Sequence, residues 1–225
     1  MNDMPPEASF MSLSALESRE RSSRYNQRKQ ENVVHLGIHE LGDRDGRIDP
    51  LLWEGKPVPP RQWIVEGLIP RGEVTMLTGN GGEGKSLITM QLLVATAINS
   101  RWLGKAVPRI KSLGVYCEDD PEELQRRSDG ILRHHGRSFA DLDGMMLVSR
   151  KGMDSTMYEA MFNDMVGRPS AFYERVRKTA IGWGAELIVL DSLYNFFGGN
   201  ENARPQANQF VNMLASIAQE IHGAV

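Results

Sequence analysis

The sequence has very little of what secreted and membrane proteins need. Its 225 residues include one cysteine, Cys117, which has no partner for an internal disulfide. The first ten residues carry acids and prolines in place of a basic and then apolar run, and the most apolar stretch, residues 87–98, is interrupted by Thr89, Gln91 and Thr96. We therefore expect no signal peptide and no membrane span, and a reducing cytoplasm is the compartment that fits.

A strong net charge is also missing. The formal net charge is -3 and the isoelectric point is near 6.0. Composition therefore neither supports nor excludes a nucleic-acid partner, which would have to contact local loops. The five histidines lack a cysteine-rich neighbourhood of the kind that binds zinc, and we interpret His134 and His135 as a solvated pair.

The chain is predicted to divide near residue 50. Residues 1–50 are rich in polar side chains without a sustained apolar period, so we expect a largely disordered N-terminal extension with a short helix around residues 13–30. Whether this extension is a tail without function or an arm that docks a partner stays open. Residues 51–225 are expected to form one core.

The core alternates strands and helices. This order predicts an α/β fold, a three-layer sandwich with a mostly parallel central sheet and helices on both faces. Asp120 is expected to cap a further helix, with Pro121 at its first position. The predicted strands cover residues 73–78, 113–117, 145–149 and 187–190, and the predicted helices cover residues 85–99, 170–183 and 210–221. Residues 151–169 receive no assignment.

The clearest motif comes directly after the first predicted strand. The pattern G-x-x-x-x-G-K-[ST] is matched by Gly79, Gly84, Lys85 and Ser86. Glycines suit a loop that wraps a phosphate, and the amide groups at the start of the next helix point at one spot where an anion can sit. We expect this segment to bind ATP through Gly79, Asn80, Gly81, Gly82, Glu83, Gly84, Lys85, Ser86 and Leu87.

Catalysis requires a metal and a group that activates water. Lys85 is expected to contact the β- and γ-phosphates, and the Ser86 hydroxyl to ligate Mg²⁺. Asp191 ends an apolar strand at the edge where ligands of α/β sheets bind, so it is the second candidate for positioning the metal. Glu118 is the expected general base, with Asp119 and Asp120 as rivals. We assign the capping of the following helix to Asp120.

Together these segments resemble the RecA-like P-loop ATPases of the plasmid and phage RepA type. The resemblance spans about residues 50–225 and rests on Trp63–Pro70, the loop Gly79–Ser86, Tyr116–Asp119, Leu187–Asp191 and Phe197–Asn202. It implies assembly into a homo-oligomeric ring, commonly a hexamer, that couples ATP hydrolysis to movement along single-stranded DNA. Members of that family continue into a further strand, a γ-phosphate sensor and an arginine, so we expect this core to lack its C-terminal strands.

Three functions remain open at this point. The first is a DNA helicase or motor ATPase in plasmid or phage replication, and the second is a nucleotide-switched scaffold or regulator of replication or recombination without motor activity. The third, a small-molecule kinase, is weakened because no arginine-rich lid is recognisable, although residues 151–169 could hold one.

Overall fold

The computed structural model describes residues 17, 19–24, 46–161 and 166–225. The chain divides into two compact units, residues 1–59 and 60–225. In the first unit, residues 19–24 are helical, and the short helix η2 (Pro50–Trp53) is capped by Asp49. The disorder expected for residues 1–50 falls largely outside the described residues. The second unit carries all of the predicted site residues.

A parallel sheet lies at the centre of this unit. Its strands are β5 (Ser112–Tyr116), β6 (Met145–Ser149) and β9 (Leu187–Asp191), in the order β6-β5-β9. The register aligns Tyr116 with both Ser149 and Asp191, so the carboxyl ends of the strands lie at one edge. These strands match the predictions for residues 113–117, 145–149 and 187–190, and the α/β prediction is confirmed.

The segment before the glycine loop differs from its prediction. Residues 74–80 have no regular secondary structure, although Thr75 donates its backbone N–H to Val225 O (2.8 Å) and Val225 donates to Glu73 O (3.3 Å). Ala224 in turn forms a parallel bridge with Leu187. The C-terminal residues thus lie between β9 and this segment, and the pairing is too short to make residues 73–78 a strand of the sheet.

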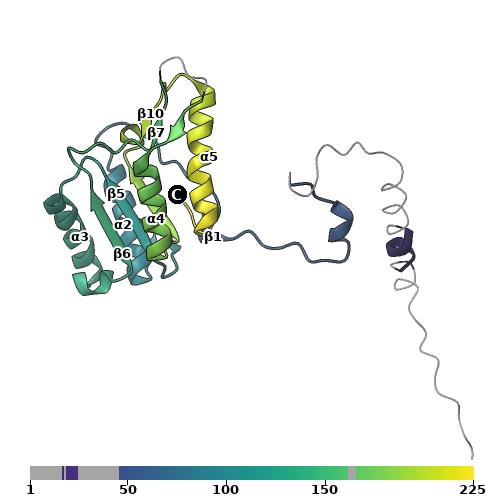
Figure 1. Cartoon of the computed structure of the whole chain (residues 1–225). Coiled ribbons are helices and arrows are strands. Elements are labelled where there is room, and N and C mark those ends of the chain that lie inside the picture. The colour runs from purple at the N-terminus through teal and green to yellow at the C-terminus, as the bar shows by residue number, and fades with distance from the viewer. Residues whose placement is uncertain (1–16, 18, 25–45, 162–165) are drawn as a thin grey trace, which may run out of the picture. The chain divides into compact units, whose positions relative to one another are not determined.

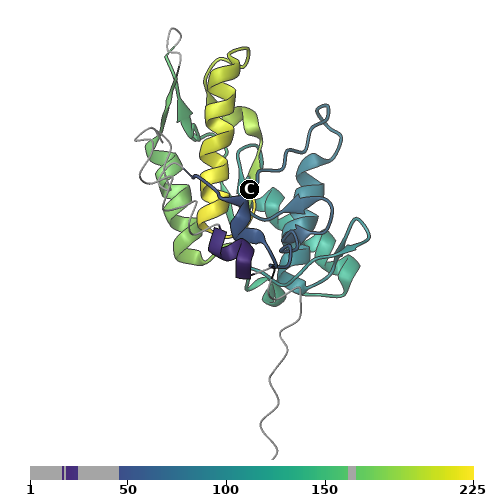
Figure 2. The ribbon, with the colours of Figure 1, turned by 90° about the vertical axis from the view of Figure 1, so that its right-hand side faces the viewer.

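Helices cover both faces of the sheet (Figures 1 and 2). One face carries α2 (Lys85–Ile98) and α3 (Pro121–His135), whose apolar residues share a buried cluster with Tyr116, Leu187 and Val189. The other face carries α4 (Ala171–Trp183) and α5 (Arg204–Glu220), which share a second cluster with Leu113 and Ile188. Alternate residues of each strand therefore face opposite helix layers, as a three-layer sandwich requires.

The packing of α2 on β5 depends on a glycine. A Cβ atom at Gly114 would lie 2.5 Å from Leu93 Cδ1 and 2.8 Å from Tyr116 Cε2. Next to this contact, Thr89 Oγ1 donates to Ser86 O (3.0 Å) and lies 3.3 Å from the Tyr116 hydroxyl. The close approach fixes α2, and with it the start of the helix, against the central strand.

The unassigned stretch of residues 151–169 contributes to a small sheet at one end of α5 (Figure 1). Within it, β7 (Tyr158–Glu159) pairs with β8 (Arg168–Pro169) and with β10 (Phe197–Gly198). The remaining short elements are η3 (Phe139–Leu142), η4 (Leu193–Asn195), β1 (Trp63–Val65), β2 (Ile69–Pro70), β3 (Arg101–Trp102) and β4 (Lys105–Ala106). Among the described residues, none of the helices is both long and apolar enough to cross a membrane.

Candidate functional site

The predicted phosphate loop lies directly before α2. Gly84 is the N-cap of this helix, with φ 83°, and no side chain caps the amide groups of the first turn. Gly82 also adopts a left-handed conformation, with φ 78°. Side chains with a Cβ atom disfavour this region, so the structure gives a conformational reason for glycine at these two positions. Gly79 and Gly81 have no positive φ, so this conformational reason does not extend to them.

Glu83 folds back across the loop. Its carboxylate accepts hydrogen bonds from the backbone N–H of Asn80 (2.8 Å) and from the Asn80 side-chain amide (2.9 Å). A Cβ atom at Gly79 would lie 2.5 Å from Glu83 Oε2. This oxygen is the end of a flexible, exposed side chain that can move aside, so the contact does not require glycine at position 79. Glu83 closes the loop from within.

The Lys85 ammonium group also lies over the loop. Its Nζ donates to the carbonyl oxygens of Gly79 (2.8 Å) and Asn80 (2.6 Å). Gly79 to Gly84 are exposed, and Leu87 lies in the first turn of α2 with 41% of its surface exposed. A compact positive charge and the uncapped amides of α2 thus surround the same stretch of backbone, which is an arrangement that suits a polyanion.

The fold brings Ser86 and Asp191 together although they are far apart in sequence. The carbonyl of Asp191 accepts the backbone N–H of Cys117 (2.7 Å), which fixes the end of β9 beside β5. Burial raises the pKa of Asp191, and the nearby Glu118 charge raises it further, whereas the Ser86 hydroxyl and the charges of Arg127 and Lys85 oppose this rise. A hydroxyl and a half-buried carboxylate therefore meet beside the loop.

The three carboxylates after β5 have different partners. Asp120 accepts the N–H of Glu123 (2.8 Å) and so caps α3, as predicted, and it also pairs with Lys151 (2.9 Å). Asp119 is buried and pairs with Arg127 at 2.7 Å. Burial raises the pKa of Asp119, and the Arg127 guanidinium opposes this rise.

Glu118 differs from both neighbours because it is exposed and accepts a hydrogen bond from a neutral hydroxyl. The Ser192 Oγ donates to Glu118 Oε1 at 2.8 Å. Since Ser192 directly follows Asp191, this contact places the Glu118 carboxylate next to the end of β9. Of the three rivals, Glu118 is the one whose carboxylate no cation or helix cap engages among the described contacts.

Sequence reasoning missed several residues around this centre. Arg127 could have been found, because it lies four residues after Glu123 on the same helix face and pairs with it at 2.9 Å. Ser192 gave no signal, since its contact with Glu118 depends on how β9 lies beside the end of β5, and the role of Asn195 depends on that contact in turn. His134 and His135 contact each other edge to face at the end of α3, and the described residues hold no group of three or more potential metal ligands of the His, Cys, Asp and Glu type.

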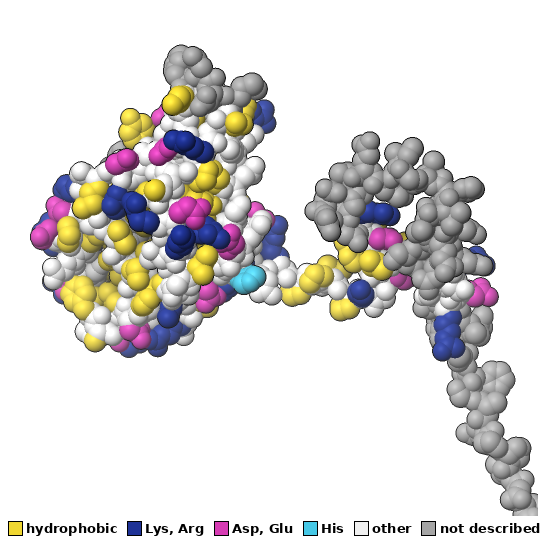
Figure 3. All heavy atoms as spheres, in the orientation of Figure 1, with side chains coloured by type: hydrophobic (Ala, Val, Ile, Leu, Met, Phe, Trp, Pro, Cys, Tyr) yellow, Lys and Arg dark blue, Asp and Glu magenta, His cyan; other side chains and the backbone are white. Residues whose placement is uncertain are grey.

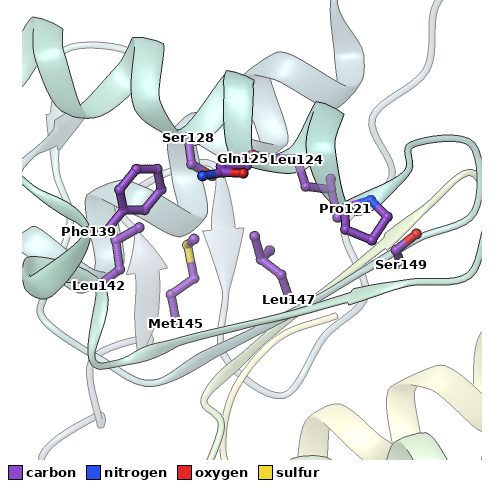
Figure 4. Close-up of a pocket in the computed structure, with 9 residues that line it drawn as sticks. All are labelled: Pro121, Leu124, Gln125, Ser128, Phe139, Leu142, Met145, Leu147 and Ser149. Carbon is purple, nitrogen blue, oxygen red and sulfur yellow. The ribbon is translucent and has the colours of Figure 1, made fainter.

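A separate hollow lies beside the carboxylates that follow β5, because Pro121 and Ser149 line it and Ser149 Oγ donates to Asp119 O (2.8 Å). It has a volume of about 360 Å³ and is formed by α3, η3 and β6 (Figure 4). Phe139, Leu142, Met145 and Leu147 give it an apolar lining. None of the predicted site residues lines it.

The geometry of the loop agrees with a comparison with known families. A family model described as an AAA domain matches residues 47–225. The chain belongs to the AAA domain family. An AAA domain is a P-loop ATPase core, so nucleotide binding and ATPase chemistry belong to this chain in general terms. No curated protein matches it significantly.

Proposed function

We propose that this AAA domain binds ATP with Mg²⁺ at residues 79–87 and hydrolyses it with Glu118 as the general base. The observation that supports this most is the meeting of Ser86 and Asp191 beside the Lys85 loop, with Glu118 adjacent to them. Phosphate ligands, metal ligands and a water-activating carboxylate are the parts that this reaction needs.

The donor set suits the proposed metal. Mg²⁺ prefers oxygen ligands, and the Ser86 hydroxyl and the Asp191 carboxylate supply them. Partial burial raises the pKa of Asp191, and a divalent cation beside the carboxylate would oppose this rise. The ion, when bound, would supply positive charge beside the phosphates. Asp191 and Ser86 would hold it in place.

The remaining residues divide the work between binding and proton transfer. The uncapped amides at the start of α2 and the Lys85 ammonium would hold the phosphates and stabilise charge that develops on them. Glu118, at the carboxyl end of β5, would orient a water molecule and accept its proton as the water attacks the terminal phosphate.

Replacement of Glu118 by Gln tests the role of this carboxylate. The variant should lose nearly all ATP turnover and still bind ATP, because the amide keeps the shape of the side chain but is a far weaker base. Glu122→Gln on the exposed first turn of α3 is a matched control. We expect phosphate release at the wild-type rate from this control. Unchanged turnover in Glu118→Gln would remove the assignment.

We further propose that the chain acts as a ring-forming, hexameric motor or helicase on single-stranded DNA in plasmid or phage replication. The support is the resemblance of its ordered motifs to RepA-type ATPases. Charge supports it less, because Figure 3 shows basic and acidic side chains intermixed on the face in view, and the net charge is -3.

The acidic balance favours a second candidate, a nucleotide-switched scaffold that does not move along DNA. A motor should hydrolyse ATP faster when single-stranded DNA is added, and this stimulation should decline as salt rises. A switch should show no such stimulation. Analysis of the reaction products separates both from a small-molecule kinase, which would form a phosphorylated metabolite in place of free phosphate.

A further inference from the structure

A short chain of hydrogen bonds ends on the proposed general base. Asn195 Nδ2 donates to Ser192 Oγ at 3.0 Å, and Ser192 Oγ donates to Glu118 Oε1 at 2.8 Å. We propose that Ser192 is a positioning residue that holds the Glu118 carboxylate in its working orientation, and that Asn195 fixes the direction of the Ser192 hydroxyl. This inference rests on the proposed function of Glu118.

The direction of donation is set by the atoms involved. A serine hydroxyl has one proton and two lone pairs. Because the Asn195 amide is a donor, it occupies a lone pair of Ser192, and the hydroxyl proton is left for Glu118. Hydrogen bonds to a charged carboxylate are stronger than those between neutral groups. One oxygen of Glu118 is thereby tied down, and Oε2 stays available for a water molecule.

The backbone around Ser192 keeps this arrangement in place. Ser192 is the N-cap of η4, and the backbone N–H of Asn195 in this helix donates to the Ser192 carbonyl at 3.0 Å. The next residue, Phe196, is fully buried, and its carbonyl accepts the N–H of Met157 at 2.8 Å. The turn that carries Asn195 is therefore anchored in the core.

Glu118 needs such a support because of its surroundings. It is exposed at the sheet edge, so its long side chain would otherwise sample several rotamers. Arg127 of α3 is engaged by Asp119 (2.7 Å) and Glu123 (2.9 Å). A small displacement of a catalytic group from its productive geometry lowers the rate strongly. Ser192 supplies the restraint without adding a charge.

Ser192→Ala tests the inference in the full-length chain. We expect kcat for ATP hydrolysis to fall by roughly ten- to a hundredfold, the range for a lost hydrogen bond to a charged group. The dissociation constant for ATP should stay within about twofold, because Ser192 is assigned no contact with the nucleotide. Ser192→Thr keeps the hydroxyl and should retain most of the rate, and Asn195→Ala should give a smaller loss.

The matched control is Ser216→Ala, which removes an exposed hydroxyl of α5 that donates to its own helix backbone at Asn212. This variant should turn over ATP at the wild-type rate.

A double-mutant comparison gives the sharpest readout. In the Glu118→Gln background, Ser192→Ala should cause no further loss of the residual rate, because the carboxylate that Ser192 positions is no longer present to accept a proton.

The outcomes separate this inference from the proposed function. If Glu118→Gln abolishes turnover and Ser192→Ala matches the wild type, the positioning role is wrong and the function of Glu118 stands. If Ser192→Ala lowers the rate equally in both backgrounds, Ser192 acts independently of Glu118 and the inference fails. Absence of turnover in the wild-type chain overturns both. If Ser192→Ala folds poorly, Asn195→Ala takes its place, and equal rates for Asn195→Ala and the wild type would refute the positioning role of Ser192.

Discussion

Replacing Gly114 by Ala tests how closely α2 must approach the central sheet. The added methyl group would lie 2.5 Å from Leu93 Cδ1, 2.8 Å from Tyr116 Cε2 and 3.1 Å from Leu147 Cδ2. Leu93 and Tyr116 are almost fully buried and cannot turn into solvent. Overpacking of this kind costs about 1–3 kcal/mol. For a domain of this size, the melting temperature should fall by roughly 2–12 °C.

Gly130→Ala is the control, and it should change the free energy of unfolding in the opposite direction. Gly130 lies inside α3, and a Cβ atom there would have no neighbour within 4 Å. Alanine is the better helix former, so this variant should gain about 0.5–1 kcal/mol. Both melting temperatures can be measured by calorimetry, with urea denaturation as a second measure of the free energy of unfolding.

Gly114→Ala should also weaken nucleotide binding, because α2 carries Lys85 and Ser86 while β5 leads to Glu118. Displacing the helix moves the loop relative to the carboxylates. A Gly114→Ala protein that melts at or above the wild-type temperature would refute the packing argument, and so would a loss of stability in Gly130→Ala of the same size.

Two further predictions concern the charges after β5. Arg127→Ala should lower the free energy of unfolding by about 1–3 kcal/mol, since it leaves the buried Asp119 carboxylate unpaired. Arg126→Ala removes an exposed side chain and should have little effect. Equal urea midpoints for the two variants would contradict this prediction. The hydrogen bond from Lys151, with that from the α3 backbone, lowers the pKa of Asp120. The contribution of the ionised Asp120 to the stability of the fold is therefore present above about pH 4 and is lost as the pH falls through the lowered pKa. Asp120→Asn keeps the cap without this charge, so its melting temperature should approach that of the wild type as the pH is lowered from 7 to 3.

Local patterns predicted the elements whose stability is largely decided within the segment. The predicted helix over residues 85–99 is observed as Lys85–Ile98, and the strand over residues 145–149 is observed with the same bounds. The cap at Asp120 was readable because aspartate followed by proline and acids is a local signal.

Elements that depend on distant partners were not predicted. The two-residue strands β7 and β8 are held by tertiary contacts, such as the hydrogen bond from the Tyr158 hydroxyl to Gln209 of α5 (2.8 Å). Residues 73–78 resemble a strand in their apolar composition, yet their pairing depends on how far Val225 and its neighbours extend alongside them. Short apolar segments carry no information about such partners.

The site was predictable to the extent that parallel strands share an edge. Asp191 and the acidic residues after β5 follow strands in register, so their proximity could be expected from the sequence. The division of roles could not, because it depends on Arg127 engaging Asp119 and on Ser192 engaging Glu118. The use of Glu83 to close the loop likewise needed coordinates.

The central claim is that the amides at the start of α2 and the Lys85 ammonium hold the phosphates of ATP. Titration calorimetry of Mg²⁺-ATP against the wild type and Lys85→Ala measures this directly, with Lys105→Ala in the exposed strand β4 as the control. We expect Lys85→Ala to weaken binding by at least roughly thirtyfold, as loss of a charged partner of the phosphates would, and Lys105→Ala to bind as the wild type does. Equal affinity of Lys85→Ala and the wild type would contradict the account.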